Sequence, residues 1–205
     1  MSKFFWNIIA RRYAKSAIAN EDIYNIKINK TREYMRDDMR VLEFGCGTGS
    51  TALLHAPFVN DYLGIDSSEK MIEICHEKLR HTDIFNLTFQ IQSFDDFTSP
   101  PESFDLILGL NILHLMQKPN NVLSKVNQLL KPGGLFIQST PCVLDSTPWL
   151  RFILPPLSWS GLLPSLSYMS ERDLIMLLED AGFKNLYQLA KETPSQAEFI
   201  VSEKQ

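Results

Sequence analysis

The sequence predicts an α/β fold in which a mostly parallel sheet is flanked by helices. Short apolar runs typical of strands alternate with segments whose apolar residues recur at helical spacing, which indicates right-handed crossovers between parallel strands. The continuous apolar run FDLILGL at 104–110 is typical of a strand covered on both faces. Three glycines, Gly45, Gly47 and Gly49, crowd the turn that leads from the first strand into the next helix.

The predicted elements follow in chain order. They are helices 3–19 and 21–36, strand 40–45, helix 51–59, strand 61–66, helix 67–80, strands 86–92 and 104–110, helix 120–130, and strand 135–140. In helix 67–80, Met71, Cys75 and Leu79 fall on one face, and Ser67 or Ser68 can cap its first turn. Helix 120–130 runs into KPGG, whose proline and glycines predict its end.

The last third of the chain differs from the rest in composition and in its pattern of predicted elements. Segment 141–170 holds five of the eleven prolines, the aromatics Trp149, Phe152, Trp159 and Tyr168, and only two charged residues. A helix is predicted over 170–183, with Ser170 as its N-cap and Gly182 as its stop. Two strand-like runs, 185–191 and 197–204, flank a turn-forming segment and predict an antiparallel hairpin.

Composition excludes several classes of protein. The 205 residues suit one domain, and the net charge of −4 argues against general nucleic-acid binding. Three separated cysteines, with no Cys or His spacing typical of a metal site, indicate a reducing, cytoplasmic setting without a metal. No apolar run reaches the roughly 18–20 residues of an integral membrane segment. Residues 1–40 nevertheless hold nine Lys and Arg against five Asp and Glu.

Two carboxylates accompany the glycine turn. Glu43 stands at the end of the first strand, where it can hold a ligand ammonium group or pair with an arginine of the N-terminal region. Asp66 ends the second strand, where a carboxylate can bind both ribose hydroxyls or cap the following helix. We expect the glycines to leave room for a ligand that approaches the backbone.

Four stretches in this order resemble successive motifs of the class I S-adenosylmethionine-dependent methyltransferases. They are VLEFGCGTG, LGIDSSEKMI, SFDLILGLNILHLM and LLKPGGLFI, and they cover about residues 40–140. The resemblance implies a Rossmann-like three-layer αβα sandwich with N-terminal lid helices. Its seven-stranded sheet would run 3-2-1-4-5-7-6 with strand 7 antiparallel.

The resemblance also implies how one domain over 1–205 is organised. Residues 1–38 would form the helical lid, 39–140 the cofactor-binding core and 171–205 the final helix and hairpin. Segment 141–170 follows the fifth strand, at the sheet edge where open α/β proteins bind ligands, so we expect it to cap the methyl acceptor. The N-terminal stretch is amphipathic, free of acidic residues and Arg-containing, as a mitochondrial transit peptide is. We favour a folded lid helix because WNIIARRYAKS resembles the segment over the cofactor in many members.

The residues that the resemblance assigns to S-adenosylmethionine, with S-adenosylhomocysteine as product, fall into four groups. The methionine part would be held by Glu43 and by the backbone of Gly45, Cys46, Gly47 and Gly49, and the ribose would be bound by Asp66. The adenine would lie near Ser67, Met71, Ser93 and Phe94. Backbone contacts to the cofactor would come from Leu110 and Asn111. Many relatives have an acidic residue where this chain has Ser93, and Asp95 or Asp96 is an alternative there. Tyr13 and Tyr24 either close over the cofactor or are ordinary helix aromatics.

The chemistry predicted is methyl transfer to a small or medium-sized acceptor, apolar compounds among them. His114 is either a general base beside the acceptor or a histidine packed at a corner, and Cys46 is more typical of a tight turn than of a catalytic thiol. A nicotinamide-dependent oxidoreductase and a catalytically silent cofactor-binding relative are the alternatives. No pattern in the sequence predicts an oligomeric state.

Overall fold

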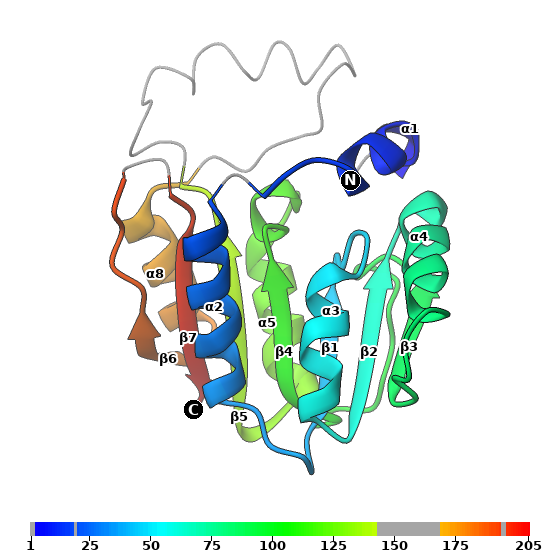
Figure 1. Ribbon diagram of the computed structural model, residues 1–205. Helices are drawn as coiled ribbons and strands as arrows, with labels where there is room; N and C mark the ends of the chain where they lie inside the picture. Colours follow the sequence, from blue (N-terminus) through cyan, green and yellow to red (C-terminus); the bar gives the residue numbers. More distant parts are fainter. Residues whose placement is uncertain (1–2, 19, 143–168, 194–195) are drawn as a thin grey trace. The chain divides into compact units, whose positions relative to one another are not determined.

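The structure is a computed structural model that describes residues 3–18, 20–142, 169–193 and 196–205 (Figure 1). Its elements are α1 Lys3–Ala14, α2 Glu21–Glu33, β1 Arg40–Phe44, α3 Ser50–His55, η1 Ala56–Phe58, β2 Asp61–Asp66, α4 Glu69–Leu79, β3 Leu87–Ile91, β4 Phe104–Leu110, η2 Leu113–Leu115, α5 Pro119–Leu129, β5 Leu130–Thr140, α8 Glu171–Asp180, β6 Phe183–Gln188 and β7 Glu198–Lys204.

The strands form a mixed sheet with the predicted order. Within the described residues the sheet has seven strands in the order β3-β2-β1-β4-β5-β7-β6. β1 pairs in parallel with β2 and β4, and β2 pairs in parallel with β3. β7 runs antiparallel to both β5 and β6, so the predicted terminal hairpin is confirmed.

Contacts divide the chain into two compact units. The amino-terminal unit comprises Lys3–Thr98 and Phe104–Leu108, and the carboxy-terminal unit comprises Ser99–Ser103 and the described residues of Gly109–Gln205. In the amino-terminal unit α4 packs on β2 and β3, and α1 packs on α4. In the carboxy-terminal unit α5 packs on β5 and α8, and α8 packs on β6.

Large buried side chains hold each unit together. Phe44, Tyr62, Ile65 and Leu106 are almost wholly excluded from solvent in the amino-terminal unit. In the carboxy-terminal unit the rings of Phe136 and Phe183 lie 5.7 Å apart, and both are buried. Because both faces of the central strands are covered, their sequences read as continuous apolar runs.

Several element boundaries differ from the prediction, and local chemistry explains most of them. The helix predicted over 3–19 ends at Ala14, and that predicted over 21–36 ends at Glu33. Helix 51–59 ends at His55 and continues only as η1, because Pro57 cannot extend an α-helix. The strand expected at 135–140 begins at Leu130, directly after α5, and the first strand of the hairpin occupies Phe183–Gln188 rather than 185–191.

Two predicted helix caps are confirmed. Ser68, rather than Ser67, caps α4 by accepting a hydrogen bond from the Met71 amide. Ser170 caps α8 in a reciprocal box with Asp173. Gly182 follows α8 with a φ of 81°, a left-handed conformation that glycine adopts without penalty.

The expected acceptor cap lies almost wholly outside the described residues. Of segment 141–170, the structure describes 141–142 and 169–170, so Trp149, Phe152, Trp159 and Tyr168 fall outside it. Among the helices of the described ranges, none combines the length and the apolar character that crossing a membrane requires.

Candidate cofactor site

The glycine turn joins β1 to α3 in the amino-terminal unit. Gly45, Gly47 and Gly49 have φ values of 66°, 54° and 72°, which L side chains rarely adopt. A Cβ atom at Gly47 would meet no atom within 4 Å, so the turn is open on that side. A Cβ atom at Gly49 would instead lie 2.7 Å from Cζ of Phe89. Packing against Phe89 therefore gives Gly49 a structural reason, independent of the ligand that the sequence predicts at this turn.

Asp66 fastens the glycine turn to the start of α4. Its Oδ2 accepts a hydrogen bond of 3.0 Å from the Gly47 amide, and its Oδ1 accepts one of 2.8 Å from the Ser68 amide. Burial raises the pKa of Asp66, and the two amides oppose that rise. The side-chain cap of α4 comes from the Ser68 hydroxyl, while Asp66 binds the Ser68 amide at the start of that helix.

Glu43 is a buried carboxylate that accepts a hydrogen bond from a tyrosine. The Tyr62 hydroxyl donates a hydrogen bond of 2.7 Å to Glu43 Oε2, and both side chains are almost fully buried. Burial raises the pKa of Glu43 to about 7, the Tyr62 hydrogen bond lowers it, and the charge of Asp66 raises it. None of these influences comes from a cation.

The arginines around this region are engaged elsewhere. Arg32 donates to the Leu54 carbonyl, Arg36 pairs with Asp38, and Arg40 pairs with Asp61. The alternative that Glu43 forms an ion pair with an N-terminal arginine is therefore not what the described residues show.

Ser67 and Met71 have different environments. The Ser67 hydroxyl is buried and has no hydrogen-bond partner in the structure. Met71 packs with Ala10 and Ile74 in a cluster that joins α1 to α4, with Trp6 against it. The side chain of Met71 therefore belongs to a helix interface, whereas the Ser67 oxygen still lacks a donor or acceptor.

Two thiols and a lysine line the inner side of the turn. Cys46 and Cys75 are both buried and free, and the Cys75 thiol donates to the Gly47 carbonyl at 3.1 Å. Its neighbour Cys75 and burial raise the pKa of the Cys46 thiol, so Cys46 stays protonated and unreactive. Lys78 Nζ donates to the carbonyl and hydroxyl of Thr48 and to the Ser50 hydroxyl, at 2.8–3.1 Å.

The sequence pattern does not predict this role of Lys78. Lys78 lies 28 residues after Ser50, in a helix whose pattern predicts only an amphipathic surface, so no local signal marks it.

Ser93 and Phe94 follow β3. The Ser93 hydroxyl donates to Asp96 Oδ2 at 2.7 Å and accepts from the Asp96 amide at 3.2 Å. The Phe94 ring stacks on Phe44 with centroids 4.2 Å apart. The serine thus holds the Asp96 carboxylate beside itself, whereas the Phe94 ring belongs to the core.

Tyr13 and Tyr24 lie near this site. Burial raises the pKa of Tyr13, and so do the charge of Asp66 and the proximity of Tyr24. Tyr24 Oη lies 3.4 Å from the Thr51 hydroxyl at the start of α3. Tyr13 therefore lies within electrostatic range of the carboxylate that the resemblance assigns to the ribose.

Leu110, Asn111 and His114 belong to the carboxy-terminal unit. Asn111 has a φ of 55°, its amide donates to the Ser139 carbonyl at 2.7 Å, and its Oδ1 accepts from the Ser139 hydroxyl. His114 lies in η2, its Nδ1 is buried without a partner, and burial lowers its pKa to about 4. His114 is therefore a neutral imidazole at pH 7.

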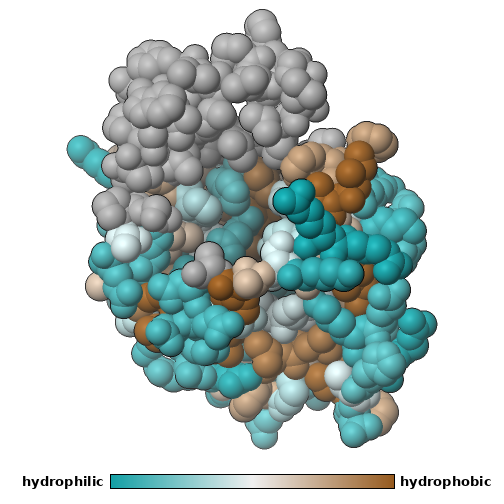
Figure 2. Space-filling view, turned by 45° about the horizontal axis from the view of Figure 1, so that its top comes forward, coloured by the Kyte–Doolittle hydropathy of each residue, from teal (hydrophilic) through white to brown (hydrophobic). Residues whose placement is uncertain are grey.

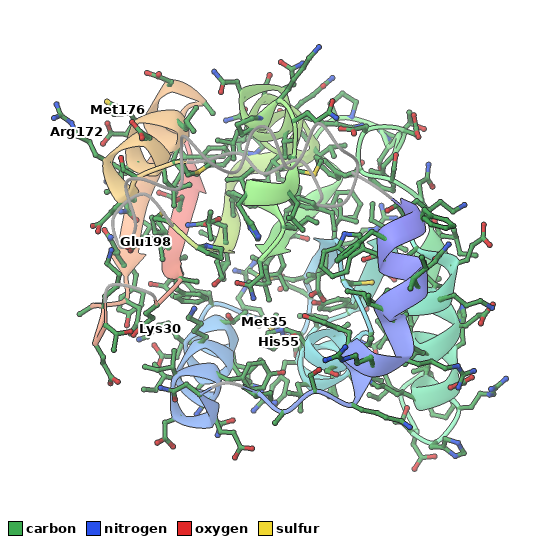
Figure 3. All side chains as sticks on the ribbon, turned by 90° about the horizontal axis from the view of Figure 1, so that it is seen from above. Lys30, Met35, His55, Arg172, Met176 and Glu198 are labelled. Atoms are coloured by element: carbon green, nitrogen blue, oxygen red, sulfur yellow. The ribbon has the colours of Figure 1, made fainter. Side chains whose placement is uncertain are left out.

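Two other buried titratable side chains are labelled in Figure 3. His55 ends α3, and burial together with the Arg32 charge lowers its pKa to about 4. Glu198 begins β7 and forms an ion pair with Lys191, which also pairs with Glu171 at 2.9 Å. Across the described ranges, no three His, Cys, Asp or Glu side chains gather so that they could hold a metal ion.

Comparison with known proteins supports one family. The family described as "Methyltransferase domain" matches residues 18–188. The chain is 31% identical over 108 residues to the uncharacterized methyltransferase YcgJ of Bacillus subtilis, which covers 53% of this chain and 42% of that protein. It is 32% identical over 125 residues to the demethylmenaquinone methyltransferase of Symbiobacterium thermophilum, covering 58% of this chain and 48% of that protein.

The chain thus spans somewhat less than half the length of these two curated relatives. Among solved structures, that of Bacillus subtilis YcgJ matches with a TM-score of 0.69 and 17% identity, over 88% of this chain and 98% of that one. At that identity the likeness concerns the fold, and it agrees with the strand order described above.

Proposed function

The chain belongs to the class I S-adenosylmethionine-dependent methyltransferase family, and we propose on that premise that its glycine turn, Glu43 and Asp66 bind S-adenosylmethionine for methyl transfer to an apolar small molecule. The family membership leaves the nicotinamide-dependent alternative without support. Bound S-adenosylmethionine would supply a methyl group that is already activated by its sulfonium. The protein then has to align the acceptor and exclude water.

The buried carboxylate of Glu43 carries this proposal. A buried carboxylate without a cation is costly, and here the nearest acidic neighbour, Asp66, adds to the cost. S-adenosylmethionine carries an ammonium group and a sulfonium, both positive. Glu43 would hold the ammonium group, and the open side of Gly47 would let the methionine part approach the backbone.

The geometry around Asp66 suits a ribose. Each of its two oxygens accepts one backbone amide, and each keeps a further lone pair for a ribose hydroxyl. The same two amides fix the orientation of the carboxylate before any ligand arrives, which reduces the entropy lost on binding. The buried Ser67 hydroxyl, which has no partner, would bond a polar atom of the bound nucleoside.

The adenine would lie between β3 and α1. Asp96, held by the Ser93 hydroxyl, would accept the adenine amine in place of the acidic residue that many relatives have. Tyr13, beside Asp66, would cover the nucleoside, in keeping with a lid role for residues 1–38. The contribution of Phe94 would come through its backbone, since its ring stacks on Phe44.

His114 is proposed as the base for acceptors that must lose a proton. Its imidazole is neutral at pH 7 and its Nδ1 has no partner, so a nitrogen lone pair is available, while the lowered pKa makes the imidazole a weak base. An apolar acceptor is proposed from the apolar composition of 141–170. An apolar acceptor also agrees with one relative, the demethylmenaquinone methyltransferase, because the substrate in its name is a quinone.

A transfer assay tests the proposal. The chain is incubated with S-adenosylmethionine carrying a tritiated methyl group and a panel of acceptors: a hydroquinone with a prenyl tail, a phenol, a fatty acid and a polar amine. We expect label to enter an apolar acceptor, and the Asp66→Ala variant to lose this activity while Glu179→Gln, an exposed residue of α8, retains it. Incorporation into the polar amine alone would contradict the proposed acceptor class. Cofactor binding without transfer to any acceptor in the panel would favour the silent relative.

A further inference from the structure

The helix α1 has one face packed on the protein and another directed to solvent. On the packed face Ala10 is fully buried among Met71 and Ile74 of α4. Ion pairing and hydrogen bonding hold the same face, because Lys3 pairs with Glu69 at 2.7 Å and the Ser68 hydroxyl donates to Asn7. The helix is therefore part of the folded amino-terminal unit, and its orientation on α4 fixes which residues point outward.

The outer face combines apolar and basic side chains. Phe4 is 75% exposed and Ile8 is 66% exposed, and the two lie one helical turn apart. Arg11 and Arg12, in the last turn of α1, and Lys15, just after the helix, continue the same stripe and are exposed, and Arg11 also pairs with Glu77 of α4 at 3.7 Å. In Figure 2 apolar surface gathers at the upper right, where Figure 1 has α1, with strongly polar side chains beside it.

This concentration is unusual for the chain. Among the described residues, four of the eleven exposed large apolar side chains lie between Phe4 and Ile18. Residues 1–20 carry four Lys and Arg and no Asp or Glu, whereas the rest of the chain has a net charge of −8. The excess of positive over negative charge therefore lies in the same stretch as these four exposed apolar side chains.

We propose that α1 docks the protein on the surface of an anionic lipid bilayer. Phe4 and Ile8 enter the boundary between headgroups and acyl chains, and Arg11, Arg12 and Lys15 lie against the negative headgroups. An interfacial helix has this composition, apolar on one side with Lys and Arg beside it. A polyanion such as nucleic acid would use the basic residues alone and would leave the exposed phenylalanine and isoleucine unexplained.

Docking fits an apolar methyl acceptor, because such a molecule concentrates in the bilayer. Tyr13 of the same helix lies near Asp66, so the helix that docks also borders the proposed cofactor site. The inference does not depend on methyl transfer, since it concerns the outer face of α1 and is tested without cofactor.

Vesicle sedimentation of the full chain is the test. Vesicles of phosphatidylcholine alone are compared with vesicles that also contain phosphatidylglycerol. We expect the wild-type chain to bind the anionic vesicles at least tenfold more strongly than the zwitterionic ones. Each basic residue near such a surface contributes on the order of fivefold, so the variant Arg11→Gln/Arg12→Gln/Lys15→Gln should lose most of this preference.

The variant Phe4→Ser/Ile8→Ser should weaken binding to anionic vesicles at least tenfold. Matched controls alter exposed residues elsewhere: Phe85→Ser for the apolar change, and Lys118→Gln/Arg172→Gln/Lys184→Gln for the charge change. Both controls should bind as the wild type does, and thermal unfolding should show that all variants remain folded. Failure of the wild type to bind anionic vesicles, or undiminished binding by Phe4→Ser/Ile8→Ser, overturns the proposal.

Discussion

Replacing Glu43 by glutamine should stabilise the ligand-free protein and weaken its hold on the cofactor. The folded state raises the pKa of Glu43 from 4.5 to about 7, so between these values it binds more protons than the unfolded state does. Stability is therefore lost as the pH rises from about 4.5 to 7, and the loss persists above pH 7. With a pKa difference of about 2.5, ionising Glu43 lowers the free energy of unfolding by roughly 3 kcal/mol at pH 8. About 1 kcal/mol of this loss is already present at pH 5.

A neutral glutamine avoids this cost and keeps an oxygen that can accept the Tyr62 hydrogen bond. The difference in unfolding free energy between Glu43→Gln and the wild type should therefore grow by about 2 kcal/mol from pH 5 to pH 8. Denaturant unfolding at the two pH values measures this difference. Glu179→Gln, an exposed residue of α8, serves as the control that should show no pH-dependent gain.

The same substitution should reduce affinity for S-adenosylhomocysteine by about 10–150-fold at pH 8, the usual loss when a charged partner is removed. Wild-type affinity should rise as the pH increases through 7, because only ionised Glu43 attracts an ammonium group, and the variant should lose this dependence. The reasoning is refuted if Glu43→Gln is less stable than the wild type at pH 8 and binds the ligand equally well.

Three further predictions test other parts of the structure. Gly49→Ala should destabilise the protein by more than 2 kcal/mol in denaturant unfolding, because its Cβ clashes and its backbone is left-handed, whereas Gly47→Ala should cost about 1 kcal/mol and mainly impair ligand binding. Lys191→Met should cost roughly 3–5 kcal/mol at pH 7, since it leaves the fully buried Glu198 without its cation; a loss under 1 kcal/mol would show the pair to be dispensable. The nuclear magnetic resonance signal of the His114 ring should stay constant from pH 8 down to about 5, and a midpoint near 6.5 would contradict its buried state.

The sequence predicts best what depends on neighbouring residues. Helix caps at Ser68 and Ser170, and the stop at Gly182, are recognisable because a cap bonds an amide three residues away. The strand order is predicted by the resemblance, since the motifs around Glu43 and Asp66 occur in a family whose topology is fixed. Boundaries near proline and glycine are less certain from sequence, as the early start of β5 shows.

Contacts between distant residues are what the sequence leaves open. The hydrogen bond between Glu43 and Tyr62 joins residues 19 apart on adjacent strands, and the environment that raises the glutamate pKa exists only once both are buried. The clamp from Lys78 to the turn spans 28 residues or more and has no local signature. Gly49 is a further case, because the Phe89 ring of β3 leaves no room for a side chain there, and that contact joins residues 40 apart in the sequence.

The central claim is that the buried carboxylates and the glycine turn form a site for S-adenosylmethionine, and calorimetric titration with S-adenosylhomocysteine tests it most directly. The product binds without turnover, and the nicotinamide dinucleotides serve as controls. The account predicts micromolar binding of S-adenosylhomocysteine, no heat from the nicotinamide dinucleotides, and markedly weaker product binding by Glu43→Gln. Absence of binding by the folded wild-type chain, or equal binding of a nicotinamide dinucleotide, would contradict it.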